Sequence, residues 1–183
     1  MKKILSIDGG GIRGLIPALV LADIESRTGR AVAQCFDLIA GTSTGGATKA
    51  LIDGGIFINS PSVSAYAEAR KIFPDETEFF LLSLGTGELI RPIAYNEARD
   101  WGKVGWLAPL LSCMFDGVAD AADYQMKMFL GNRYIRLQTN LAVASDDMDN
   151  TTNGNIENLK VEAKKLLKTH KGEIETVCGW LQQ

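Results

Sequence analysis

The chain has 183 residues, of which 46% are hydrophobic and 22% are charged, and its formal net charge at pH 7 is −3. This length and composition indicate one globular domain with its own hydrophobic core. The slightly acidic balance argues against a general nucleic-acid-binding protein, which usually carries a basic face, so we expect no nucleic-acid partner.

The first half of the chain alternates short apolar runs, glycine-rich turns and helical stretches. Strands are predicted over residues 3–7, 36–40, 49–52 and 79–84. A helix is predicted over residues 15–28, because Pro17 is tolerated in a first turn and Gly29 favours a C-terminal end. Glycines follow the strands, as is typical of a parallel α/β sheet with functional residues at the carboxyl ends of its strands.

The second half of the chain is predicted to be mainly helical. Helices are expected over residues 96–115, 120–130 and 155–168, and a strand with one exposed face over residues 134–141. We see no repeat, low-complexity linker or second core. The sequence therefore predicts a single α/β domain over residues 1–183, with a mostly parallel central sheet.

Residues 41–45, GTSTG, match the pattern G-x-S-x-G, which places a nucleophilic serine on a sharp turn between a strand and a helix. Gly41 and Gly45 would leave room for this nucleophile elbow. Ser43 would then stand at the amino end of the next helix, where developing negative charge is favoured. The alternative is a serine that only caps a helix or closes a turn.

A serine nucleophile needs a base, and the chain has one histidine. His170 lies in the lysine-rich stretch LKTHKGE, where we expect an exposed residue at a helix end rather than a catalytic base. Carboxylates and lysines remain as candidates. Asp53 follows the short apolar strand over residues 49–52 and precedes two glycines, although an aspartate of this kind can also simply form a turn.

The glycine-rich stretch DGGGIRG, residues 8–14, follows one predicted strand and precedes a helix. Its backbone N–H groups could converge on an anion, either a phosphate or the oxyanion of an acyl-transfer intermediate. Gly9, Gly11 and Gly14 fit the dinucleotide pattern G-x-G-x-x-G, but Glu25 falls within a helix instead of ending a second strand. We therefore favour the oxyanion.

Three stretches, DGGGIRG, GTSTGG and DGG, in this order resemble the patatin-like phospholipases, a family of lipid acyl hydrolases. The later stretches SLGTGE, YNEARDWG and YIRLQTNL are similar to the same family, so the resemblance extends over most of the chain. It implies a three-layer α/β/α patatin-like fold and a Ser–Asp dyad, with Ser43 as the nucleophile and Asp53 as the base.

The resemblance also implies an oxyanion hole formed by Gly9, Gly10 and Gly11, with Arg13 supporting that loop. It implies that catalysis needs no metal ion or other cofactor. The expected substrates are carboxylic esters of phospholipids, lysophospholipids or glycolipids. A lipid acyltransferase, a shortened inactive scaffold and a nucleotide-binding domain are the alternative hypotheses.

Only ten residue positions separate Ser43 from Asp53, whereas family members carry a long segment there. A crossover between parallel strands takes about a dozen residues or more. A helix of three turns would use about 11 residues by itself. We therefore predict that a segment is missing between about residues 45 and 51.

Other features give weaker signals. Cys35, Cys113 and Cys178 form no CxxC pair, so we expect no zinc site and three buried, apolar cysteines. The acidic stretch over residues 146–150 fails the EF-hand pattern and predicts a solvated loop.

The remaining signals concern the surface of the protein. Trp101, Trp106, Met114 and Phe115 are expected to pack in the core rather than contact lipid. The lysines at positions 160, 164, 165, 168 and 171 predict a solvated helix face. The N-terminus lacks a signal-peptide pattern, so we expect a cytoplasmic protein that contacts a membrane surface only transiently.

Overall fold

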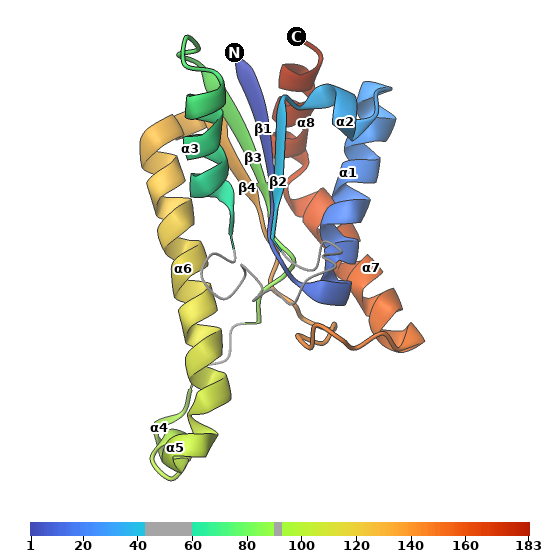
Figure 1. The fold of residues 1–183 in the computed structure, drawn as a ribbon. Coiled ribbons are helices and arrows are strands. Elements are labelled where there is room, and N and C mark those ends of the chain that lie inside the picture. Colours follow the sequence, from blue (N-terminus) through green and yellow to red (C-terminus); the bar gives the residue numbers. More distant parts are fainter. Residues whose placement is uncertain (43–59, 90–92) are drawn as a thin grey trace, which may run out of the picture.

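The computed structural model describes residues 1–42, 60–89 and 93–183 (Figure 1). Within these residues, four strands form one parallel sheet in the order β2-β1-β3-β4. The strands are β1 (Lys2–Ile7), β2 (Leu38–Gly41), β3 (Phe79–Leu84) and β4 (Tyr134–Leu137). The predicted α/β class with a parallel sheet is confirmed.

Helices cover both faces of the sheet, which gives three layers (Figure 1). One face packs against α1 (Leu15–Thr28), α7 (Asn153–Thr169) and α8 (Lys171–Leu181). The other face packs against α3 (Ser62–Ile72) and the carboxyl-terminal part of α6 (Leu107–Leu130). Shorter helices are α2 (Val32–Cys35), α4 (Tyr95–Ala98), α5 (Gly102–Gly105) and the 3₁₀ turns η1 (Gly11–Gly14) and η3 (Gly131–Arg133).

Strand β3 is buried along its whole length, which explains its continuous apolar sequence FFLLSL. Successive side chains point to opposite faces of a strand. Phe80 and Leu82 pack in the cluster with α1, α7 and α8, whereas Phe79 and Leu81 pack in the cluster with α3 and α6. The sheet thus carries two separate cores, one on each face.

Several predicted elements are confirmed. The helix over residues 15–28 and the strand over residues 79–84 have the predicted bounds. The strand over residues 3–7 is one residue longer, and the helix over residues 155–168 lies within α7. The strand expected over residues 36–40 begins later, at Leu38, because α2 and Phe36 lead into it.

Two predicted sets of elements in the second half were wrong. The helices expected over residues 96–115 and 120–130 are instead one long helix, α6, preceded by the short α4 and α5. Gly117 does not interrupt α6, since a glycine inside a helix costs only about 1 kcal/mol. The strand expected over residues 134–141 ends at Leu137, and none of its four residues is exposed, so the expected exposed face was also wrong. Beyond this strand, Asn140 forms an isolated bridge with Glu88.

The amino-terminal half of α6 extends beyond the end of the sheet (Figure 1). Cys35 and Cys178 are buried as predicted, but Cys113 on this half of α6 is exposed. Trp106 and Met114 are 41% and 54% exposed, so the predicted core packing was wrong for them. The reason is that, among residues 1–42, 60–89 and 93–183, no strand lies beside this part of α6. The side chain of Phe115 lies outside the described part.

The lysines on α7 and at the start of α8 lie mainly on the solvent side, as predicted. Among the described residues, no helix has the length and apolar character needed to cross a lipid bilayer.

Candidate functional site

The glycine-rich loop and the start of the GTSTGG stretch meet at the carboxyl edge of the sheet. Strands β1 and β2 are parallel neighbours, and Ile7 is paired with Gly41. The N–H of Thr42 donates to the carbonyl oxygen of Ile7 at 3.2 Å. The chain therefore enters its two glycine-containing motifs from adjacent strand ends.

The structure describes five of the predicted site residues, namely Gly9, Gly10, Gly11, Arg13 and Gly41. Ser43, Gly45 and Asp53 lie outside the described residues, and so does the junction at residues 45–51. The geometry of the proposed dyad and the missing segment stay predictions.

At two positions of the glycine loop, residues 8–14, the surrounding atoms leave no space for a side chain. A Cβ on Gly10 would lie 2.6 Å from Cβ of Thr86 and would also collide with Oγ1 of that residue. A Cβ on Gly11 would collide with the carbonyl oxygen of Met148, and Gly11 has a φ of +55°, which favours glycine. Within the described ranges, the N–H groups of Gly10 and Gly11 donate no hydrogen bond.

Arg13 belongs to this loop and is only 8% exposed. Its Nη1 donates to the carbonyl oxygen of Gly87 at 3.2 Å, and its Nε donates a long bond to the carbonyl oxygen of Gly10. Burial lowers the pKa of Arg13, and the carboxylates of Asp146 and Asp116 oppose that effect. Arg13 thus connects the glycine loop to the turn that follows β3.

The glycine loop is held from the sheet side by what we call the strand-edge support, formed by Asp8, Ser83, Thr86 and Arg136. Arg136 donates from Nη1 to Ser83 Oγ at 2.8 Å and from Nη2 to Asp8 Oδ2 at 2.7 Å. Thr86 Oγ1 donates to the carbonyl oxygen of Gly9 at 2.9 Å. Burial raises the pKa of Asp8 more than Arg136 lowers it.

A second set of contacts, the loop support, holds the glycine loop from the other side. The N–H of Ile12 donates to the carbonyl oxygen of Met148 at 2.9 Å. The segment around Met148 is fixed by two buried side chains of α7, Asn155 and Glu162. Asn155 accepts a hydrogen bond from the N–H of Ser145 and donates one to the carbonyl oxygen of Asn150, at 2.8 Å each. Glu162 Oε1 accepts from the N–H groups of Ala142 and Val143 at 2.6 and 2.8 Å.

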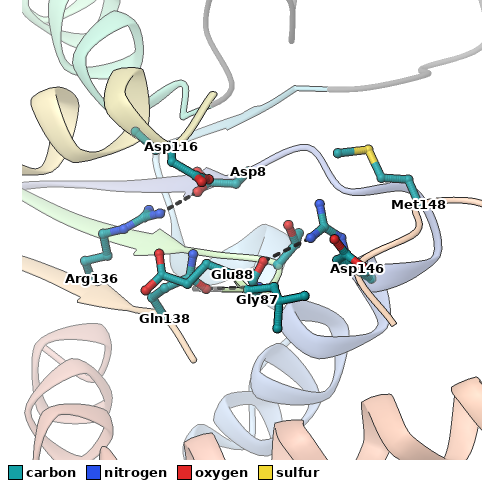
Figure 2. Close-up of a pocket in the computed structure, with 12 residues that line it drawn as sticks. Asp8, Gly87, Glu88, Asp116, Arg136, Gln138, Asp146 and Met148 are labelled. Atoms are coloured by element: carbon teal, nitrogen blue, oxygen red, sulfur yellow. Dashed lines mark hydrogen bonds and ion pairs between the residues drawn. The ribbon is translucent and has the colours of Figure 1, made fainter. Parts of the chain in front are cut away.

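A pocket of about 130 Å³ opens between the two supports (Figure 2). Its lining includes the carboxylates of Asp8, Glu88, Asp116 and Asp146 and the guanidinium groups of Arg13 and Arg136. Burial raises the pKa of Glu88 and that of Asp116, and the neighbouring Asp120 carboxylate adds to both shifts. Among the described residues, no cluster of potential ligands could hold a metal ion.

The known proteins that resemble this chain in sequence are patatins and patatin-like proteins. Patatin-like protein 3 from Arabidopsis thaliana is 30% identical over 159 residues, which is 72% of this chain and 37% of the relative. Patatin-like protein 2 from the same plant is 44% identical over 89 residues, which is 42% of this chain and 22% of the relative. The chain belongs to the patatin-like family. No protein-family model matches the chain.

The patatin-like chain spans less than two fifths of the length of these two relatives. A further relative, probable inactive patatin-3-Kuras 1 from Solanum tuberosum, is 40% identical over 81 residues, which is 40% of this chain and 21% of the relative. These relatives establish the family of the chain.

Sequence reasoning missed several residues of this patatin-like site. It assigned residues 146–150 to a solvated loop, yet Asp146 and Met148 line the pocket. It also gave no role to Asp8 and Arg136, which are 128 positions apart. The sequence offered one signal for this ion pair, the arginine in the strand YIRL. A charged side chain in a strand of a covered sheet needs a partner.

Proposed function

We propose that this chain is a serine lipid acyl hydrolase that cleaves carboxylic esters of phospholipids, lysophospholipids or glycolipids. The observation that carries the proposal is the pairing of Ile7 with Gly41, because it brings the glycine loop beside the start of the GTSTGG stretch. Membership of the patatin-like family supports the same reaction class.

In the proposed reaction, Asp53 takes the proton from Ser43 as the Ser43 oxygen attacks the acyl carbonyl carbon. The N–H groups of Gly9, Gly10 and Gly11 would donate hydrogen bonds to the resulting oxyanion. Collapse of the tetrahedral intermediate releases the alcohol, which takes the proton from Asp53, and leaves an acyl–serine ester. Asp53 then activates a water molecule, which releases the fatty acid and regenerates Ser43.

The geometry of the glycine loop favours this use. Gly10 and Gly11 leave their N–H groups without a partner among the described residues, and both positions exclude a side chain. Such donors are fixed before the reaction, so they need not reorganise when negative charge develops. We include transient contact with a lipid surface in the proposal, since the substrates reside there, and we include no metal ion.

The test is covalent labelling combined with ester hydrolysis. A fluorophosphonate probe should label Ser43, as mapped by mass spectrometry. Ser43→Ala and Asp53→Asn should each lower the kcat for p-nitrophenyl butyrate by about 10³-fold or more. Ser64→Ala, on the exposed side of α3, and His170→Ala should leave kcat nearly unchanged. Labelling of another residue in an active sample, with Ser43 unmodified, would contradict the proposal.

The second candidate function is that of an inactive scaffold. It is favoured by the short separation of Ser43 and Asp53 and by the similarity to a relative named as probably inactive. A folded protein with neither labelling nor hydrolysis would support it. If hydrolysis is observed, added glycerol or a long-chain alcohol distinguishes a hydrolase, which releases mainly fatty acid, from an acyltransferase, which forms a new ester.

A further inference from the structure

Arg136 extends across the carboxyl edge of the sheet from β4 to the end of β1. Its guanidinium bonds Ser83 Oγ at 2.8 Å and Asp8 Oδ2 at 2.7 Å. The Arg136 and Asp8 side chains are 11% and 2% exposed, so this ion pair is buried. Figure 2 shows the Arg136 guanidinium pointing toward Asp8.

The register of the strands accounts for this reach. Ser83 on β3 is paired with Arg136 on one side and with Ser6 of β1 on the other. Asp8 lies two positions after Ser6, and residues two apart leave a strand on the same face. The guanidinium therefore crosses one intervening strand and connects the ends of β1, β3 and β4.

Stability alone does not account for a buried ion pair at this place. The loss of hydration of two charges offsets much of their attraction, and well-packed apolar residues in the same position are often at least as stable. A guanidinium does provide direction, since its planar fork binds two acceptors in a fixed geometry. Here the two acceptors are Ser83 and Asp8.

Asp8 is the residue directly before Gly9, so its orientation affects the glycine loop. The N–H of Asp8 donates to the carbonyl oxygen of Leu84 at 2.9 Å, which fixes its backbone on one side. The ion pair with Arg136 fixes its side chain. A rotation of Asp8 would turn the peptide that carries the Gly9 N–H and would shift the residues that follow.

We propose that Arg136 is a positioning residue for ester hydrolysis, because its hold on the Asp8 carboxylate sets the orientation of the N–H groups of Gly9, Gly10 and Gly11. The inference deepens the proposed function and rests on it. Arg136 acts through Asp8 and does not itself contact the reacting ester.

The experiment compares Arg136→Met and Arg136→Lys with two controls in the full chain. Arg133 lies three positions before Arg136 and forms a surface ion pair with Glu78, which Arg133→Met removes. Val177→Ala lowers stability from the buried face of α8, which lies near the amino end of β1, whereas the glycine loop follows its carboxyl end (Figure 1). The measurements are kcat and KM for p-nitrophenyl butyrate, the folded fraction from urea unfolding, and hydrogen exchange of the peptide containing residues 8–14.

We expect Arg136→Met to lower kcat per folded molecule by about 10- to 100-fold, with KM within about twofold of the parent value. We expect kcat to fall while KM stays nearly constant, because the oxyanion develops in the transition state and is absent from the bound ester. Arg136→Lys should recover part of the kcat, since it restores a cation beside Asp8. Exchange at residues 8–14 should accelerate in Arg136→Met and stay unchanged in both controls.

A purely structural role predicts something different. Arg136→Met would then lose activity only in proportion to its folded fraction, with parent exchange rates in residues 8–14, and this result would overturn the inference. If the parent protein itself hydrolyses no ester, the proposed function fails. The exchange measurement still decides in that case whether Arg136 orders the glycine loop.

Discussion

The glycine loop lies between two supports that differ in chemistry and in burial. The strand-edge support uses a buried ion pair and side chains with almost no solvent exposure, such as Ser83 at 0% and Thr86 at 4%. The loop support uses backbone carbonyl and amide groups in a segment whose Met148 is 45% exposed. One support is thus part of the sheet, and the other is a surface loop that is fixed by α7.

This difference predicts how each side of the glycine loop responds to change. The strand-edge support can open only if strands at the centre of the domain separate, which requires much of the global unfolding free energy. The loop support can open locally, because its segment depends on a few hydrogen bonds to Asn155 and Glu162. The atoms that a new side chain would meet also differ: they belong to the side chain of Thr86 at Gly10, and mainly to the backbone of Met148 at Gly11. A second substitution can remove the first obstacle and not the second.

The largest effect is expected at Gly11. Gly11→Ala combines an unfavourable positive φ with a collision against the carbonyl oxygen of Met148, which should lower the free energy of unfolding by about 2–4 kcal/mol in urea titration. The colliding atom belongs to the backbone, so Met148→Gly should not rescue this variant. Loss of the loop position should also lower kcat for ester hydrolysis.

Gly10→Ala provides the matched test on the strand-edge side. Its new Cβ would collide with three side-chain atoms of Thr86, all of which Thr86→Gly removes. The double variant should therefore be more stable than the sum of the two single changes predicts, by about 1–2 kcal/mol. Additive losses at Gly10 and Thr86, or rescue of Gly11→Ala by Met148→Gly, would contradict the difference between the supports.

An intermediate effect is expected at Asn155. Asn155→Ala removes the partners of Ser145 N and the Asn150 carbonyl oxygen from a buried position, which should cost about 2 kcal/mol of unfolding free energy. Hydrogen exchange should accelerate over residues 142–150. Asn158→Ala is the control, since Asn158 lies on the same helix and makes one exposed bond to the Val143 carbonyl oxygen. Equal effects of the two variants would show that burial does not matter here.

The smallest effect is expected at Glu88. Its N–H donates to the carbonyl oxygen of Thr139, and its carbonyl oxygen accepts from the N–H of Leu141. Burial and the Asp120 carboxylate raise the pKa of Glu88 in the folded state, so folding favours its protonated form. The resulting stabilisation is complete below the unfolded pKa of about 4.3 and is lost as the pH rises through the folded pKa. Glu88→Gln, which is neutral throughout, should therefore raise stability at pH 7 and change it little at pH 3.

The gain at pH 7 should not exceed about 0.5 kcal/mol, because Glu88 is partly exposed and solvent screens its charge. Glu157→Gln is the control of opposite sign. The side chain of Lys160 lowers the pKa of Glu157, so that variant should lose stability at pH 7 instead. Urea titrations of both variants at pH 3 and pH 7 would measure the changes in the free energy of unfolding. A lower stability of Glu88→Gln at pH 7 would refute the burial argument.

The sequence by itself determined the elements whose signals are local. A continuous apolar run predicted strand 79–84, and a helical pattern ended by Gly29 predicted helix 15–28. The run of glycines after residues 3–7 predicted a backbone anion site, and that assignment stays a prediction. The stretches DGGGIRG, GTSTGG and DGG indicated the family, which the relatives confirm.

Only the tertiary structure decided which distant residues meet at the carboxyl edge of the sheet. Arg136 reaches Asp8 because β3 lies between β1 and β4 in a fixed register, and no pattern within either strand specifies that neighbour. The acidic loop around Met148 became a wall of the pocket because Asn155 and Glu162 of α7 bind its backbone. Such contacts depend on the packing order of whole elements, whereas strand and helix patterns depend on neighbours a few positions apart.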